Sequence, residues 1–294
     1  MKEKTSMGEG KGTNIWSFLY ETPLGRRLLK PICSPGVSKF VGAVLDTRVS
    51  LLLVPFFVKK HHIDMSEYES RFYSSYNEFF ARKLKKEKRP IDREAASLIS
   101  PCDGNLMLYP IEEDLTMPIK NSVYSVSSLL RSKELSKQYE GGTAVVIRLT
   151  GEDYHHYCYA ASGKKGKGHY LHGFLHAADP VALERIPVYK ENAREFCRIR
   201  TKYFGEMIQM EVGAMLVGKI CNDTDGIRDV EKGEEKGHFE LGGSTVILLM
   251  QKDTVDFDDD LLENSQQGLE TKVKMGERIG YRRLKDDTMK YFSV

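Results

Sequence analysis

Beyond Leu98 the sequence divides into short apolar runs that are separated by glycine-rich segments. The runs lie at residues 144–147, 207–220, 245–251 and 271–281. Short apolar runs between glycines are typical of strands, and strands that follow one another without regular intervening helices favour antiparallel pairing. We therefore predict a mainly antiparallel, β-rich domain over residues 96–294.

The N-terminal third has a different pattern. Residues 1–12 are polar and contain glycine, so we expect a flexible tail. Over residues 13–95 apolar side chains recur at helical spacing, and the first 99 residues contain 18 lysines and arginines against 11 acidic residues. Such helices can lie in a membrane interface or pack their apolar stripe on the rest of the protein, and the pattern leaves both open. Together the two parts predict an α+β fold.

Other features of the sequence exclude some classes of protein. The longest apolar run, residues 51–58, contains Pro55 and is far shorter than the roughly 20 residues of a spanning helix, so we expect no transmembrane helix. The five cysteines include no Cys-x-x-Cys pair, which argues against a disulfide framework and a structural zinc site. No familiar ligand spacing relates His169, His172 and His176, and we expect no metal there.

The strand predicted at residues 245–251 follows the sequence Gly242-Gly243-Ser244. Two glycines allow a sharp bend that brings the Ser244 hydroxyl close to the carbonyl carbon of Gly243. That geometry suits a chain that cuts itself at this bond. An ordinary glycine turn before a strand is the alternative interpretation, and these residues alone do not exclude it.

Two further segments carry candidate catalytic residues. Asp103 lies in the turn sequence Ser-Pro-Cys-Asp-Gly, where it can orient a histidine or simply close an Asx turn. His155 and His156 follow the strand predicted at residues 144–147, and neighbouring residues of an extended chain face opposite ways, so one of them is expected to enter a site. A histidine can act as a general base near neutral pH or be bonded to the backbone as a structural residue. Ser244, a histidine and Asp103 are the parts of a catalytic triad.

Taken together, these motifs resemble the phosphatidylserine decarboxylases, which are pyruvoyl-dependent and process themselves. The similarity follows the family's order over roughly residues 70 to 285, far more than any single motif provides. The matching segments are residues 77–84, 89–92, 100–104, 124–130, 148–155, 173–195, 212–218, 232–239 and 242–245.

The resemblance implies a precursor that becomes active by self-cleavage. Asp103 would orient a histidine, and that base would activate Ser244 to attack the carbonyl of Gly243. Ser244 would become a pyruvoyl group at the start of an α chain, residues 244–294, and residues 1–243 would form the β chain. The pyruvoyl cofactor would make a Schiff base with phosphatidylserine and accept electrons as CO₂ leaves, giving phosphatidylethanolamine. A homodimer is also implied.

One position departs from the family's pattern, since Cys158 stands where a second histidine is common. We expect His155 to be the catalytic histidine, with His156, Cys158 and Gly242 as possible supporting residues. A lipid substrate further implies a peripheral protein on the cytoplasmic face of the cell membrane, bound to anionic phospholipid. The expected membrane contacts are Leu51, Leu52, Leu53, Phe56, Phe57, Lys59 and Lys60.

Two alternatives to this function stay open from the sequence. One is a pyruvoyl decarboxylase for a related serine-containing substrate, which assays on vesicles and on free serine would separate. The other is a non-catalytic, β-rich lipid- or carrier-binding module, which would remain one uncut chain. Nucleic-acid binding is not expected, because the sequence contains no strand motif that combines aromatic and basic residues in the way RNA-binding sheets do.

Overall fold

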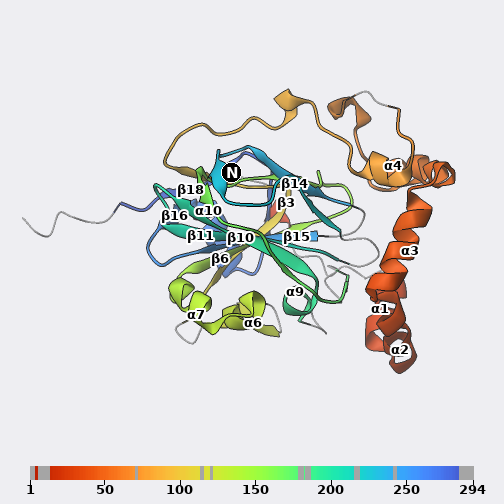
Figure 1. The fold of residues 1–294 in the computed structure, drawn as a ribbon, viewed down its shortest axis with the longest axis horizontal. Coiled ribbons are helices and arrows are strands. Elements are labelled where there is room, and N and C mark those ends of the chain that lie inside the picture. The colour runs from red at the N-terminus through yellow and green to blue at the C-terminus, as the bar shows by residue number, and fades with distance from the viewer. Residues whose placement is uncertain are drawn as a thin grey trace, which may run out of the picture.

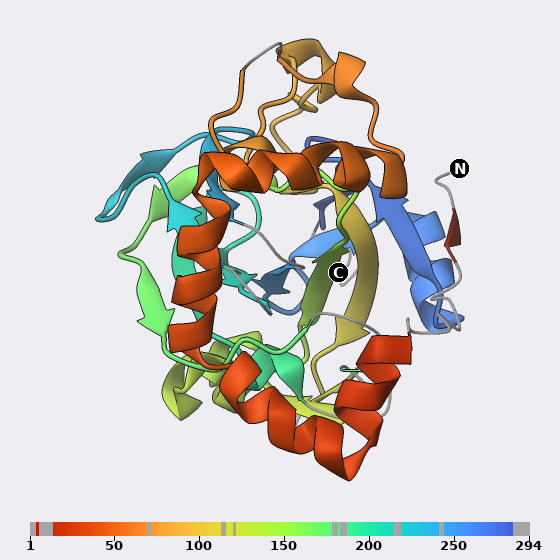
Figure 2. The same ribbon diagram turned by 90° about the vertical axis from the view of Figure 1, so that its right-hand side faces the viewer.

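The computed structural model describes residues 4–5, 14–69, 72–112, 116–119, 122–177, 182, 187–214, 219–240 and 244–284. A column of helices from the N-terminal part stands at one end of a body of strands (Figure 1). Seen from that end, the helices border the sheets (Figure 2). This arrangement confirms the predicted α+β class.

Four α-helices of the described part lie in the first 60 residues, and the others are spread among the strands. The α-helices are α1 (Asn14–Glu21), α2 (Pro23–Ile32), α3 (Pro35–Leu45), α4 (Val54–Lys60), α5 (Tyr76–Phe80), α6 (Val126–Leu130), α7 (Lys133–Ser136), α9 (Val188–Glu191) and α10 (Asp259–Gln266). The 3₁₀ turns are η1 (Arg48–Leu53), η2 (Met65–Glu67), η3 (Lys86–Lys88) and η4 (Lys137–Tyr139).

The strands form one large sheet and several small ones. They are β1 (Lys4–Thr5), β2 (Ser97–Ile99), β3 (Gly104–Pro110), β4 (Thr116–Ile119), β5 (Ser122–Ser125), β6 (Thr143–Leu149), β7 (His156–Cys158), β8 (Gly163–Lys165), β9 (His169–Leu171), β10 (Arg194–Thr201), β11 (Glu206–Val212), β12 (Ile220–Asn222), β13 (Arg228–Val230), β14 (Glu235–Phe239), β15 (Ser244–Met250), β16 (Val255–Phe257), β17 (Glu270–Val273) and β18 (Arg278–Arg282). The ten-stranded sheet has the order β1-β17-β3-β6-β15-β11-β10-β8-β13, with β9 also paired to β10. The smaller sheets are β12-β14-β7, β16-β18-β2 and β4-β5. Strand pairing is antiparallel throughout the described part, as predicted.

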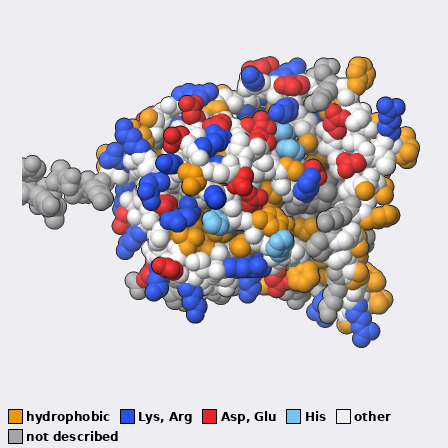
Figure 3. Space-filling view, in the orientation of Figure 1, with side chains coloured by type: hydrophobic (Ala, Val, Ile, Leu, Met, Phe, Trp, Pro, Cys, Tyr) orange, Lys and Arg blue, Asp and Glu red, His pale blue; other side chains and the backbone are white. Residues whose placement is uncertain are grey.

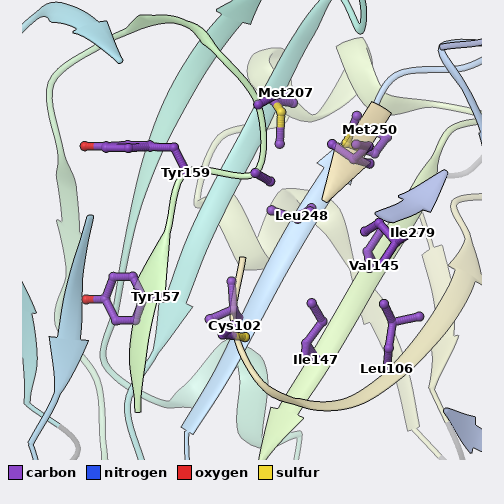
Figure 4. Close-up of a cluster of buried hydrophobic side chains, with 14 of the residues drawn as sticks. Cys102, Leu106, Val145, Ile147, Tyr157, Tyr159, Met207, Leu248, Met250 and Ile279 are labelled. Atoms are coloured by element: carbon purple, nitrogen blue, oxygen red, sulfur yellow. The ribbon is translucent and has the colours of Figure 1, made fainter. Parts of the chain in front are cut away.

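The hydrophobic core lies on both faces of the large sheet, at β6 and β15. Val145 and Ile147 of β6 contribute to the same buried cluster as Leu248 of β15 (Figure 4). Ala144 and Val146 belong to a second cluster, because successive residues of a strand face opposite sides. Both faces are therefore apolar, which explains why these strands read as continuous apolar runs.

Two predicted strands are each divided in the structure, which corrects the sequence analysis. The run at residues 207–220 contains β11 and the start of β12, which belong to different sheets. The run at residues 271–281 contains β17 and most of β18, and the chain turns between them at Gly276, whose φ is +90°. A Cβ there would lie 2.6 Å from the carbonyl oxygen of Pro90, so the turn requires glycine.

Within the helical region predicted at residues 13–95, residues 35–60 form three separate elements, α3, η1 and α4. Thr47 takes an extended conformation, and its hydroxyl donates to the Val44 carbonyl at the end of α3 (2.7 Å). Such a side-chain bond competes with continuation of the helix. Within the described residues no single helix is long and apolar enough to cross a membrane. The segments Gly36–Leu45 and Arg48–Lys60 reach the length and apolar composition of a span only when taken together, and the chain bends by 81° between them.

Specific hydrogen bonds attach the N-terminal helices to the β-rich body. The backbone N–H of Ala177 donates to the Tyr20 hydroxyl (2.9 Å), and that of Leu175 donates to the Cys33 carbonyl (3.2 Å). Lys4 and Thr5 pair with β17, which differs from the loose tail expected at these two residues.

Candidate active site

Ser244 is the first residue of β15 and is fully buried. It lies opposite Leu149, the last residue of β6. Its hydroxyl has no hydrogen-bond partner among the described residues. A buried hydroxyl without a partner costs free energy, so the position is typical of a functional group. Gly242 and Gly243, the other residues of the predicted cleavage site, lie outside the described residues.

A tight turn after β6 brings His155 to the end of the sheet where Ser244 lies. The backbone N–H and the hydroxyl of Thr150 both donate to Asp153 Oδ2 at 2.7 Å. Lys272 donates to the other carboxylate oxygen of Asp153 at 2.6 Å. These bonds hold the turn that reverses the chain, and His155 follows it directly.

The surroundings of His155 define its protonation state. Its Nδ1 lies 2.9 Å from the carbonyl oxygen of Asp153, which can only accept, so Nδ1 carries the hydrogen. Its Nε2 is buried without a partner among the described residues and holds a free lone pair. Burial, with a contribution from the positive charge of Arg82, lowers the pKa of His155 to about 3. The residue is therefore neutral near pH 7 and can accept a proton at Nε2.

The helical segment covers this end of the sheet. The Phe80 ring, at the end of α5, lies 4.2 Å from the His155 ring, centroid to centroid. A Cβ at Gly151, in the turn after β6, would lie 2.7 Å from the His61 ring. Arg82, buried just after α5, lies over the Tyr68 ring at 4.4 Å. Sequence reasoning missed Arg82 as part of the site, although it belongs to the matching segment 77–84.

His156 has no free ring nitrogen. Its Nδ1 lies 2.6 Å from Glu235 Oε1, and its Nε2 lies 3.0 Å from the carbonyl oxygen of Ala81. The hydrogen bond from His156 lowers the pKa of Glu235 to about 2, so the partner is a carboxylate that accepts. Acceptors therefore lie at both nitrogens, and His156 fits a positioning role rather than that of a base.

Cys158 is also unsuited to act as a base in this structure. The side chain is buried, and burial raises its thiol pKa to about 12, with the negative charge of Asp103 contributing. The backbone N–H of Cys158 donates to the Pro101 carbonyl (2.8 Å), and the Cys158 carbonyl accepts from the Gln209 side chain (2.9 Å). Among the three candidates, the geometry therefore favours His155.

Among the described residues, no hydrogen bond joins the Asp103 side chain to a histidine. Its carboxylate accepts from Arg89 through Nε (2.7 Å) and Nη2, and from the backbone N–H of Met275 (2.9 Å). This differs from the role that the resemblance implies, because the carboxylate pairs with the guanidinium of Arg89 and not with a histidine. Arg89 was part of a matching segment, but its sequence alone did not indicate this pairing.

A cavity of about 510 Å³ is lined by β7 and by residues of the segment 83–93. Basic side chains, including Lys83, Arg89 and Arg93, line it together with His156 and Cys158. Ser244 and His155 do not line this cavity. The run of basic residues at 82–89 is the sequence signal for it.

The expected membrane contacts divide into two groups. Leu52 and Phe56 are 80% and 69% exposed, and Lys59 and Lys60 are exposed as well, as is Leu53. Phe57 instead packs against the ring of Tyr76 at 5.6 Å, and Leu51 is half-buried. Phe57, like Leu51, is half-buried and exposes less apolar surface than Leu52 and Phe56, and the membrane contact itself stays a prediction.

The β-rich body thus holds a buried serine and a neutral histidine at one end of its main sheet, and these are the candidate nucleophile and base. The sequence model for phosphatidylserine decarboxylase matches residues 76–281. The chain is 45% identical over 264 residues to phosphatidylserine decarboxylase proenzyme 2 of Clostridium acetobutylicum, covering 90% of each chain. It is 38% identical over 274 residues to the phosphatidylserine decarboxylase proenzyme of Ruminiclostridium cellulolyticum, covering 92% of this chain and 91% of the relative. The chain belongs to the phosphatidylserine decarboxylase family, a family of decarboxylases.

Proposed function

We propose that this protein is a phosphatidylserine decarboxylase that cuts itself between Gly243 and Ser244. The observation that carries the proposal is the placement of two buried atoms without partners among the described residues, Ser244 Oγ and His155 Nε2, at the same end of the sheet. One is a nucleophile that needs to lose a proton, and the other is a base that is neutral near pH 7. Membership of the phosphatidylserine decarboxylase family supports phosphatidylserine as the substrate.

The proposed cleavage begins when His155 Nε2 takes the proton of Ser244 as Oγ attacks the carbonyl carbon of Gly243. His155 then gives this proton to the nitrogen of residue 244 as the C–N bond breaks, and the peptide becomes an ester. In the elimination that follows, neutral His155 takes the Cα proton of residue 244, the Cα=Cβ bond forms and the Cβ–Oγ bond breaks, which leaves Gly243 as the carboxylate terminus of the β chain and residue 244 as dehydroalanine. Water adds and ammonia leaves, so that a pyruvoyl group starts the α chain, residues 244–294.

The residues around Ser244 fit a pyruvoyl group. The position is fully buried, and an uncharged carbonyl suits it better than an amino terminus would. When formed, the pyruvoyl group would supply the carbonyl that binds the substrate amine and accepts electrons as CO₂ leaves. His155 would remain beside it as a neutral imidazole that holds or returns a proton at Nε2.

The substrate is proposed to arrive from a membrane that the N-terminal helices touch. These helices carry most of the large exposed apolar side chains of the described residues, and such side chains gather over that end of the molecule (Figure 3). They are Phe18, Leu24, Leu28, Phe40, Val44, Val49, Leu52, Leu53 and Phe56. Exposed basic residues lie among them, as in interfacial helices that bind anionic lipid. Peripheral attachment to the cytoplasmic face of the cell membrane follows from this proposal.

The mass of the purified full-length protein tests self-cleavage. We expect two chains, the smaller one beginning at position 244 with a pyruvoyl group. Ser244→Ala should give one uncut chain, and His155→Gln should slow cleavage by roughly 10²–10⁴-fold, the usual contribution of a general base. His172→Gln, at an exposed position, is the matched control and should be cut normally. One uncut wild-type chain would contradict the proposal.

Two assays on the cut protein test its substrate and its membrane contact. Release of CO₂ from phosphatidylserine vesicles but not from free serine is expected. Replacing both Leu52 and Phe56 by serine should weaken flotation with anionic vesicles, whereas Ile227→Ser, which removes a 62%-exposed apolar side chain from the β-rich body, should not. Equal flotation of the two variants would contradict the proposed membrane surface.

A further inference from the structure

A group of three potential metal ligands lies in the small sheet β12-β14-β7. Cys221 of β12 is directly opposite His238 of β14. Glu240 lies two residues beyond His238, on the same side of the extended chain. One ligand atom from each of these three residues lies within 4.8 Å of the other two.

We propose that Cys221, His238 and Glu240 bind a divalent transition-metal ion of the zinc class. Thiolate, imidazole and carboxylate are the ligands that zinc uses, at about 2.0–2.3 Å from the ion, so ligand atoms at a tetrahedral site lie roughly 3–4 Å apart. The group therefore needs only small movements to close on an ion. All three residues are half-buried, so an ion can reach them from solvent.

The present partners of these side chains are compatible with exchange for a metal. Lys219 donates to Glu240 Oε1 at 2.9 Å, and Cys221 Sγ lies 3.4 Å from the same oxygen. The Lys219 side chain is 66% exposed and can turn into solvent when an ion takes its place as the counter-charge. The thiol proton of Cys221 must leave when its sulfur binds the ion.

The position of the group gives the metal a consequence for the enzyme, and this step rests on the proposed self-cleavage. Glu240 precedes Ser244 by only four positions, so after cleavage it would lie near the new end of the β chain. The His238 ring also stacks on the His156 ring, with 5.0 Å between centroids, and His156 follows the turn at residues 150–153. A metal bound here would hold the end of the β chain against the sheet after the peptide bond is lost.

Cobalt provides the direct test, because zinc has no visible spectrum. Titration of metal-free, uncut Ser244→Ala protein with Co²⁺ should produce visible d–d bands and a near-ultraviolet thiolate-to-cobalt band that saturate together at one equivalent. Zn²⁺ should abolish both. Cys221→Ser should lose the thiolate band, and His238→Gln should weaken binding, whereas the matched variant Cys33→Ser should behave like the parent.

The same titration can overturn the inference. Absence of the thiolate band, or a band that persists in Cys221→Ser, would rule out this site. Because the uncut variant is used, the result does not depend on whether the protein cuts itself. In the cut wild-type enzyme, Zn²⁺ should raise the thermal unfolding temperature, and Cys221→Ser should abolish the rise; an equal rise in both would contradict the role at the end of the β chain.

Discussion

Acidification should destabilise the fold through His155, and the size of the effect follows from its burial. The pKa of this imidazole is about 3 in the folded chain, against about 6.5 when it is exposed. Between these values the unfolded chain binds a proton that the folded chain does not, so the free energy of unfolding falls as the pH falls from about 6.5 towards 3. At about pH 5 this group lowers the free energy of unfolding by about 2 kcal/mol, and at pH 7 it lowers it by about 0.2 kcal/mol.

The comparison uses two uncut chains, Ser244→Ala and Ser244→Ala with His155→Gln, so that both are in the same covalent state. Urea unfolding at about pH 7 and about pH 5 gives the free energy of unfolding of each. Glutamine does not titrate, so the parent chain should lose about 2 kcal/mol more than the variant on this change of pH.

The exposed His172→Gln change, in the same Ser244→Ala chain, controls for loss of an ordinary histidine. Its loss of stability should match that of the parent. If the His155→Gln chain also loses as much as the parent, burial does not lower the pKa of His155, and the protonation state inferred for it is wrong.

Further substitutions test two buried ion pairs against an exposed one. Lys236→Met leaves the Glu211 carboxylate unpaired inside the protein and should lower the free energy of unfolding by about 3–5 kcal/mol; adding Glu211→Leu should recover most of this loss in urea unfolding, and no recovery would contradict the pairing. Asp103→Asn removes the charge that pairs with Arg89, and we expect a loss of about 3 kcal/mol by the same measurement. Asp253→Asn, in an exposed pair, should cost less than about 1 kcal/mol, and equal losses for the two aspartates would contradict the role of burial.

The sequence predicted those elements whose patterns are local. The strands at residues 144–147 and 245–251 are found as β6 and β15, because both are continuous apolar runs that end at turn residues. The division of residues 271–281 was not predicted. Its cause is the close approach of Pro90 to Gly276, a contact between segments far apart in the chain.

The same distinction applies to the candidate site. The order of the motifs and the Gly-Gly-Ser sequence before an apolar strand can be read directly along the chain, and they identified Ser244. The partner of Asp103 could not be read in this way, since Arg89 and Met275 reach it from separate segments. The ligand group of Cys221 and His238 depends on strand register, which a linear spacing does not reveal.

By itself, the sequence determined the family, the α+β class and the serine, because these depend on residue types in order. Only the tertiary structure shows that the two adjacent histidines have different environments. Glu235 and Ala81 occupy both nitrogens of His156, while burial leaves His155 neutral, with Nε2 unpartnered among the described residues. The physical reason is that a proton's free energy depends on the solvation and partners of the group that binds it, and folding supplies both.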